Sequence, residues 1–206
     1  IEGERVLAAS CIRTPTEGMV VHSENHRAKT ARKMVMELLI ADQPSRDTAH
    51  DPDSELWRYA ETQDVDAARF PAKASPAPDS SHPAIAVNMD ACIQCNLCVR
   101  ACREVQVNDV IGLASRGADA HIVFDFGDDM GASTCVGCGE CVQACPTGAL
   151  MPKTLLNDSQ ALAITPDRQV DSVCPYCGVG CQLTFSVKDA KIVSVSGRQG
   201  PANAGR

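Results

Sequence analysis

Residues 92–102 read CIQCNLCVRAC, and residues 135–145 read CVGCGECVQAC with Pro146 directly after them. Both stretches have the cysteine spacing C-x2-C-x2-C-x3-C, and six of their eleven positions are identical. Three closely spaced thiolates can bind three irons of a 4Fe-4S cluster, while the fourth cysteine of such a run binds the cluster of the other run. The spacing therefore predicts a duplicated motif that binds two 4Fe-4S clusters.

The ligands are expected to cross between the two copies. Each predicted set takes three cysteines from one copy and the last cysteine from the other, which gives Cys92, Cys95, Cys98 and Cys145 for one cluster and Cys135, Cys138, Cys141 and Cys102 for the second. Two adjacent clusters would form an electron relay.

Zinc and disulfide bonds are the alternatives for these cysteines. Structural zinc sites usually combine two C-x2-C pairs across a longer loop, which explains neither three evenly spaced cysteines nor the Cys-Pro ending. The even total of twelve cysteines permits disulfides. However, a chain of 206 residues with 44% apolar residues can build a core without them, and disulfides belong to oxidising compartments. Iron–sulfur clusters are the preferred interpretation, and thiols in this number indicate a cytoplasmic protein.

A third cysteine group has a different spacing. Residues 174–181 read CPYCGVGC, and alternating apolar residues at 183–187 and 191–195 then predict a β-hairpin around residues 188–190. This stretch resembles the N-terminal cluster domain of molybdenum or tungsten bis-pterin oxidoreductases, most closely formate dehydrogenases. Residues 201–206 resemble the segment that precedes the last ligand in that family. The resemblance implies a 4Fe-4S site of Cys174, Cys177 and Cys181 whose fourth ligand lies beyond Arg206.

Cys11 stands far from the other cysteines, within residues 9–21, which read ASCIRTPTEGMVV. This stretch resembles the last ligand segment of the plant-type 2Fe-2S domain of complex I and its hydrogenase relatives. The resemblance implies that Cys11 binds a 2Fe-2S cluster whose other ligands precede Ile1. The alternative is a small buried apolar residue, which is the common role of an isolated cysteine. Two incomplete cluster sites imply part of a larger subunit.

Residues 26–41 predict a helix with Ser23 as its N-cap. Its apolar positions are Ala28, Ala31, Met34, Val35, Leu38 and Leu39, and the basic residues Arg27, Lys29, Arg32 and Lys33 are expected on a solvated face. A second, short helix is predicted around Leu56, Trp57, Tyr59 and Ala60, with Asp53 as a cap.

In complex I relatives the first helix leads into a cluster motif H-P-x2-C-x2-C-x5-C. The corresponding ligand positions here are Gln43, Asp47, His50 and Leu56. None is a cysteine, and a cluster requires soft thiolate ligands. This cluster is therefore predicted to be lost, and His50 is predicted to lie on the surface.

Composition and charge exclude several functions. The formal net charge of −7 argues against a nucleic-acid partner. No stretch has the roughly twenty apolar residues that cross a bilayer. The sequence also has no G-x-G-x-x-G or Walker motif.

Residues 71–83 contain four prolines and predict an extended linker.

The fold class expected is α+β, built as tandem small iron–sulfur domains. The expected parts are the C-terminal part of a 2Fe-2S ferredoxin domain (1–24), a helical region without cluster ligands (25–70), a linker (71–83), a double 4Fe-4S ferredoxin domain (84–155), and a connector with the start of a bis-pterin enzyme domain (156–206).

The order of these parts resembles the catalytic α subunit of NAD-dependent formate dehydrogenases. The resemblance implies that this region passes electrons from a molybdenum or tungsten bis-pterin guanine dinucleotide centre, which lies outside this sequence, toward FMN and NAD. FMN and NAD would be held by a flavin- and NAD-binding β subunit. A small 2Fe-2S γ subunit would be a further partner. Two alternatives stay open. One is a non-catalytic electron-transfer subunit of a complex I-like or hydrogenase complex, and the other is a different bis-pterin enzyme such as a nitrate reductase.

Overall fold

The computed structural model describes residues 1–74 and 76–204, and it has the mixed helix and sheet content that the sequence predicts. The elements, in chain order, are η1 (Ser10–Ile12), α1 (His26–Ile40), η2 (Arg46–Thr48), α2 (Glu55–Thr62), β1 (Ile85–Val87), η3 (Met89–Ala91), α3 (Leu97–Arg100), η4 (Ala101–Val105), β2 (Ile111–Ala114), η5 (Gly117–Asp119), β3 (His121–Phe124), α4 (Glu140–Ala144), β4 (Leu150–Pro152), η6 (Lys153–Leu155), β5 (Arg168–Val173), β6 (Gln182–Lys188) and β7 (Lys191–Gly197).

The first helix begins at His26, where the side chain of Asn25 accepts a hydrogen bond from the amide of Ala28 at 2.8 Å. Asn25 is therefore the N-cap, and the prediction of Ser23 was wrong. The short helix α2 has Ser54 at its N-cap position, and no side chain caps it, so the prediction of Asp53 as the cap was wrong as well.

The helices α1 and α2 share a small core of their own. Its buried residues are Met36, Ile40, Ala49, Leu56, Trp57, Ala60 and Val65. Glu37 is also buried, and its carboxylate accepts a hydrogen bond from Arg69 Nε at 2.7 Å, which satisfies the charge inside this core.

The buried face of α1 agrees only in part with the one that the sequence predicts, since Leu39 packs against this core and Ala28 and Ala31 are half-buried. Met34, Val35 and Leu38 are 45%, 53% and 55% exposed, whereas Met36, Glu37 and Ile40 are buried. The helix carries apolar side chains on more than one side near its C-terminal end, so their periodicity alone does not define the packed face. The Glu37–Arg69 ion pair allows the face that contains a charge to be the buried one.

Two antiparallel strand pairs and two short helices form the ferredoxin-like part of the chain. Strand β1 pairs with β4, so that Ile85 lies opposite Pro152, and β2 pairs with β3, so that Ile111 lies opposite Phe124. Each cysteine motif passes from a loop into a short helix, α3 in the first copy and α4 in the second. Apolar residues of both strand pairs and several of the cysteines form one core.

The proline-rich segment 71–83 is fixed at its C-terminal end. Asp79 forms two backbone hydrogen bonds with Val87, and its carboxylate accepts a hydrogen bond from the amide of Met130 at 2.7 Å. His82 is 6% exposed, and its Nδ1 accepts hydrogen bonds from the amides of Ala84 and Ile85. Residues 79–82 therefore pack on the ferredoxin part and do not form a free linker.

We expect Gly131→Ala to destabilise the protein by about 2 to 3 kcal/mol. A Cβ atom at Gly131 would lie 2.5 Å from the backbone carbon of Ser81, so the segment 79–82 would have to move. Gly112→Ala is the matched control, since its Cβ would lie 3.7 Å from Val123, an ordinary contact. Urea unfolding of both variants measures the difference, and equal stabilities would contradict the close approach.

The C-terminal part is a three-stranded antiparallel sheet in the order β5-β6-β7. The predicted hairpin is present as β6 and β7, and it turns at Asp189 and Ala190, which both have positive φ values. Strand β5 was not predicted. All six of its residues are exposed, so it has no buried face that would produce a clear pattern.

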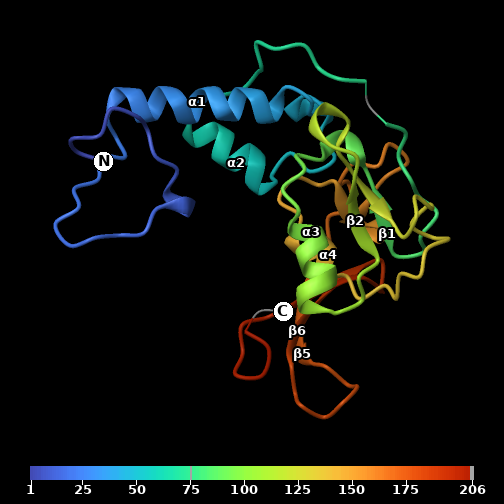
Figure 1. The fold of residues 1–206 in the computed structure, drawn as a ribbon. Coiled ribbons are helices and arrows are strands. Elements are labelled where there is room, and N and C mark those ends of the chain that lie inside the picture. The colour runs from blue at the N-terminus through green and yellow to red at the C-terminus, as the bar shows by residue number, and fades with distance from the viewer. Residues whose placement is uncertain (75, 205–206) are drawn as a thin grey trace.

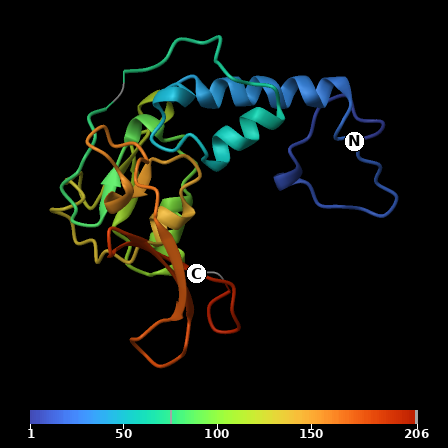
Figure 2. The same cartoon turned by 180° about the vertical axis from the view of Figure 1, so that it is seen from behind.

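The ferredoxin-like part lies between the helices α1 and α2 and the C-terminal sheet (Figure 1). Helices α1 and α2 lie on one side of it, and the sheet β5-β6-β7 extends from another. The view from behind shows residues 1–25 as loops at the outer end of α1, away from the strands β1 to β4 (Figure 2). No helix among the described residues is long and apolar enough to cross a membrane.

Candidate functional site: two cysteine-lined cavities

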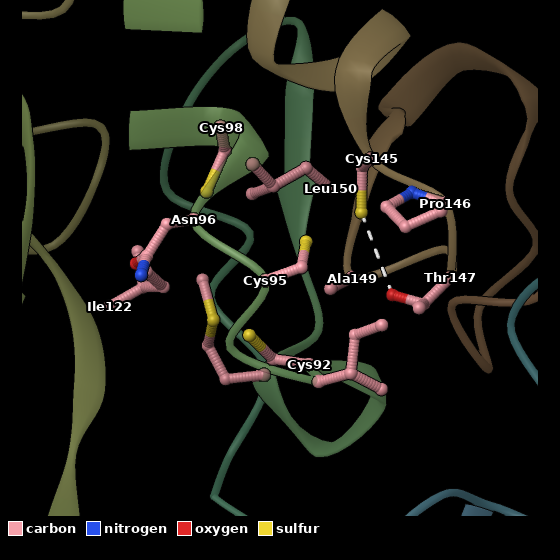
Figure 3. Close-up of a pocket in the computed structure, with 12 residues that line it drawn as sticks. Cys92, Cys95, Asn96, Cys98, Ile122, Cys145, Pro146, Thr147, Ala149 and Leu150 are labelled. Atoms are coloured by element: carbon pink, nitrogen blue, oxygen red, sulfur yellow. Dashed lines mark hydrogen bonds between the residues drawn. The ribbon is translucent and has the colours of Figure 1, made fainter. Parts of the chain in front are cut away.

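The first cavity brings together Cys92, Cys95, Cys98 and Cys145, the set expected from the crossed spacing. Figure 3 shows the four sulfur atoms directed toward the space between them, three from the first motif and Cys145 from the second. The space between them is partly open to solvent. Thr147 Oγ1 lies 3.6 Å from Cys145 Sγ (Figure 3).

The second cavity contains the complementary set, Cys102 with Cys135, Cys138 and Cys141. Cys102 reaches it from η4, a turn of π-helix, which is a local widening that is frequent at functional sites. The amide of Val110 donates a hydrogen bond to Cys102 Sγ at 3.3 Å. The fold therefore groups eight cysteines into two sets of four.

The two loops have the same backbone conformation although their sequences differ. Gly137 and Gly139 have φ values of 68° and 78°, and the corresponding residues Gln94 and Asn96 have 56° and 61°. The left-handed conformation turns the amide of Gln94 toward Cys92 Sγ and that of Gly137 toward Cys135 Sγ, each at 3.4 Å. Amide donors at ligand sulfurs are a way in which proteins adjust cluster potential.

Burial raises the pKa of three of the thiols that line the cavities, those of Cys92, Cys98 and Cys141. It raises the pKa of Cys98 to about 12, with a further contribution from the neighbouring Cys92, Cys145 and Cys95. It raises the pKa of Cys141 to about 12 as well, with Cys135 as the next cause. A buried thiolate is costly without a cation, so these sites favour bound metal over free thiolates.

The residues present fit two 4Fe-4S clusters better than two zinc ions. A single zinc ion requires its ligands to converge to about 2.3 Å from one point. Within residues 1–74 and 76–204, no group of three or more Cys, His, Asp or Glu residues lies close enough to hold one metal ion. Four thiols gathered around one cavity, three from one motif and one from the other, are the ligand arrangement expected for a 4Fe-4S cluster.

The third cysteine group lies in the loop between β5 and β6. The amide of Cys174 donates to the carbonyl of Cys181 at 2.7 Å, which closes the loop that carries Cys177. The segment after β7 is held against the start of β6 by Asn203. Its side chain accepts a hydrogen bond from the amide of Gln182 and donates one to the carbonyl of Gln182. Gly205 and Arg206, the end of the expected last-ligand segment, lie outside the described residues.

Cys11 lies in η1 and is exposed. The alternative interpretation of Cys11 as a small buried residue is therefore wrong. Its assignment as a 2Fe-2S ligand stays a prediction.

His50 is not a surface residue, so that expectation was wrong. Its side chain is 11% exposed. Its Nε2 lies 2.9 Å from the carboxylate of Asp90, and its Nδ1 lies 2.8 Å from the carbonyl oxygen of Gln160. The hydrogen bond to Asp90 is the main cause that raises the pKa of His50 above its ordinary value of 6.5, against the opposing effect of burial.

The raised pKa of His50 predicts a pH-dependent stability. The stabilisation from protonated His50 beside Asp90 is complete below about pH 6.5. This stabilisation disappears as the pH rises through the raised pKa of His50 in the folded state. His50→Gln should therefore show a smaller loss of unfolding free energy between pH 6 and 8 than the unchanged protein. His121→Gln is the control substitution, because the exposed His121 lies outside the His50–Asp90 pair and its Nδ1 contacts the backbone carbonyl of Asp119. Identical profiles for the unchanged protein and His50→Gln would contradict the role of the pair.

The sequence did not reveal two asparagines at the cavities. Asn96 lines the first cavity, with a buried Oδ1 that has no hydrogen-bond partner. Asn108 lines the second, with its Nδ2 4.0 Å from Cys138 Sγ. Asn96 lies within the first motif and Asn108 six residues after Cys102, but cysteine spacing contains no signal for either.

Comparison with known families agrees with this geometry. Residues 91–149 match the 4Fe-4S dicluster domain, and residues 167–206 match the molybdopterin oxidoreductase Fe4S4 domain. The chain is therefore an iron–sulfur protein with ferredoxin-like 4Fe-4S domains of these two kinds.

Among individual relatives, the chain is 30% identical over 204 residues to an NADH-quinone oxidoreductase subunit of Rhizobium meliloti, an alignment that covers 95% of this chain and 23% of the relative. It is 33% identical over 180 residues to the NADP-reducing hydrogenase subunit HndD of Solidesulfovibrio fructosivorans, covering 82% of this chain and 30% of the relative. It is 22% identical over 242 residues to a putative formate dehydrogenase of Staphylococcus haemolyticus, covering 98% and 25%. The chain thus spans about a quarter of the length of these relatives.

A solved structure shares the fold. The crystal structure of an NAD+-reducing [NiFe]-hydrogenase in the H2-reduced state superimposes with a TM-score of 0.62 at 24% identity, covering 71% of this chain and 64% of the hydrogenase chain.

Proposed function

We propose that this chain is the electron-transfer region of a formate dehydrogenase catalytic subunit. Electrons released when formate is oxidised to carbon dioxide would enter at the cluster of Cys174, Cys177 and Cys181. They would continue through the paired clusters and leave by the 2Fe-2S centre of Cys11 toward a flavin- and NAD-binding subunit. The observation that carries the proposal is the exchange of Cys102 and Cys145 between the motifs, which places two four-cysteine sites in one small domain.

The residues have distinct tasks in this relay. The eight cysteines would hold the two 4Fe-4S clusters, which supply one-electron transfer when bound. The core around them, including Ile122, Met130 and Leu150, excludes water from the sites. A dry, low-dielectric surrounding limits reorganisation and helps to set the potential.

A non-catalytic electron-transfer subunit is the second candidate. The match to the NADH-quinone oxidoreductase subunit over 95% of this chain supports it, and so does the match to the hydrogenase subunit HndD. The molybdopterin oxidoreductase Fe4S4 match at residues 167–206 supports the formate dehydrogenase.

Formate-dependent NAD reduction by the full-length complex separates the two candidates, with iron, molybdenum and tungsten quantified on the same sample. Turnover together with molybdenum or tungsten would support the dehydrogenase. Iron without either metal and without formate turnover would favour the electron-transfer subunit. Absence of iron and acid-labile sulfide would refute both.

A further inference from the structure

The region of α1 and α2, residues 26–70, has no cysteine and yet packs against one of the two cysteine sites. We call it the helical region. Its contacts reach both chain segments that carry ligands of the first site, the Cys92–Cys95 loop and the segment after Cys145.

The Cys92–Cys95 loop is held by a side chain and by an ion pair. Ile93 lines the first cavity and also packs against the core of the helical region. Two residues before Cys92, the carboxylate of Asp90 pairs with His50 Nε2 at 2.9 Å. The loop is thus joined to the helical region by one apolar and one polar contact.

The segment after Cys145 is held through its backbone. The amide of Leu56, in the first turn of α2, donates to the carbonyl of Pro146 at 3.0 Å. Gly148 approaches Asp51 so closely that a Cβ atom there would lie 3.0 Å from the Cβ of Asp51. Pro146 itself lines the first cavity, so α2 contacts the wall of the site.

The helical region lines neither cavity itself, but it contacts Ile93 and Pro146, which line the first cavity, and the contacts described above reach no residue that lines the second. The motif repeat makes the difference visible at one position. Val136 of the second motif corresponds to Ile93 of the first, and Val136 is 69% exposed.

We propose that the helical region is a fixed cover for the first 4Fe-4S cluster, with Ile93 and His50 as positioning residues that keep water out and hold the two ligand segments together. This inference rests on the proposal that the first site binds such a cluster. Solvent access stabilises the more negatively charged reduced cluster and admits oxidants and chelators. The cover therefore protects the first cluster and keeps its potential low, and it leaves the second cluster unaffected.

The test compares Ile93→Ala combined with His50→Ala against the matched control Val136→Ala in the full-length protein. Loaded protein is exposed to a chelator, and the clusters that remain are followed by EPR after reduction, with signals assigned from Cys145→Ser and Cys102→Ser variants. We expect the first cluster to be lost roughly tenfold faster in the double variant. Its midpoint potential should become more positive. The second cluster should keep both its rate of loss and its potential.

Ile93→Leu should restore both properties of the first cluster, because it keeps the volume of the side chain. His50→Gln alone provides the same test if the double variant does not fold. The proposed cover would be overturned if the double variant changed both clusters equally or changed neither. It would also be overturned if Val136→Ala alone caused the same loss of the first cluster. A wild-type protein without iron and sulfide would refute the proposed function itself, and this inference with it.

Discussion

Replacing Cys145 by serine is expected to remove the cluster held by Cys92, Cys95 and Cys98, which belong to the other motif. Cys145 completes the first cavity although it is the last cysteine of the second motif. A serine oxygen is a much poorer ligand for iron than a thiolate. Iron content should therefore fall by up to about four atoms per chain, the content of one 4Fe-4S cluster.

Cys102→Ser should have the reciprocal effect on the second site, since Cys102 lines the cavity of Cys135, Cys138 and Cys141. Iron analysis combined with EPR of the reduced protein measures both losses. Cys11→Ser is the control for EPR, because Cys11 lies in η1 outside both cavities, and it should leave the EPR signals of both 4Fe-4S clusters intact. Loss of the Cys135–Cys138–Cys141 cluster in Cys145→Ser would show instead that each motif supplies all its own ligands.

Removal of iron is expected to unfold the ferredoxin-like part. Cys102 and Cys141 belong to its buried core, and four more cysteines pack against that core. Without clusters, the cysteines of each set lose the iron bonds that hold the two motifs together across the domain. Structural metal centres contribute on the order of 10 kcal/mol to folding, so we expect a loss of several kcal/mol.

The raised thiol pKa values add a pH dependence to the metal-free state. Cys98 and Cys141 stay protonated in the folded chain up to about pH 12, whereas their ordinary value is 9.0. Their contribution to stability is therefore complete below pH 9 and is lost as the pH rises from 9 to 12.

Hydrogen exchange of β1 and β4 before and after chelation measures the unfolding that removal of iron causes. Unchanged protection after complete removal of iron would contradict it.

The chemistry of the two sites was predictable from the sequence, because thiolate spacing and duplication are local properties of the chain. The crossed grouping of the eight cysteines followed from the same spacing, and the structure places them accordingly. The hairpin of β6 and β7 was likewise predicted, since alternation with turn residues is a local signal.

The packing of the helical region was not predictable in this way. Which face of α1 is buried depends on Arg69, thirty-two residues from its partner Glu37. The burial of His50 depends on Asp90 and Gln160, which lie 40 and 110 residues away. The sequence predicted that the helical region has lost its cluster ligands. Only the long-range contacts show which residues His50 contacts instead.

The sequence by itself determined which residues can bind iron–sulfur clusters and how the ligand sets cross, because motif spacing encodes ligand geometry over a few residues. Only the tertiary structure decided that the helical region packs against residues of the first site. Ile93 and Val136 occupy equivalent motif positions, and their different exposure arises from the helical region, whose core packs against Ile93. Burial of this kind depends on contacts between segments distant in sequence, which local spacing does not encode.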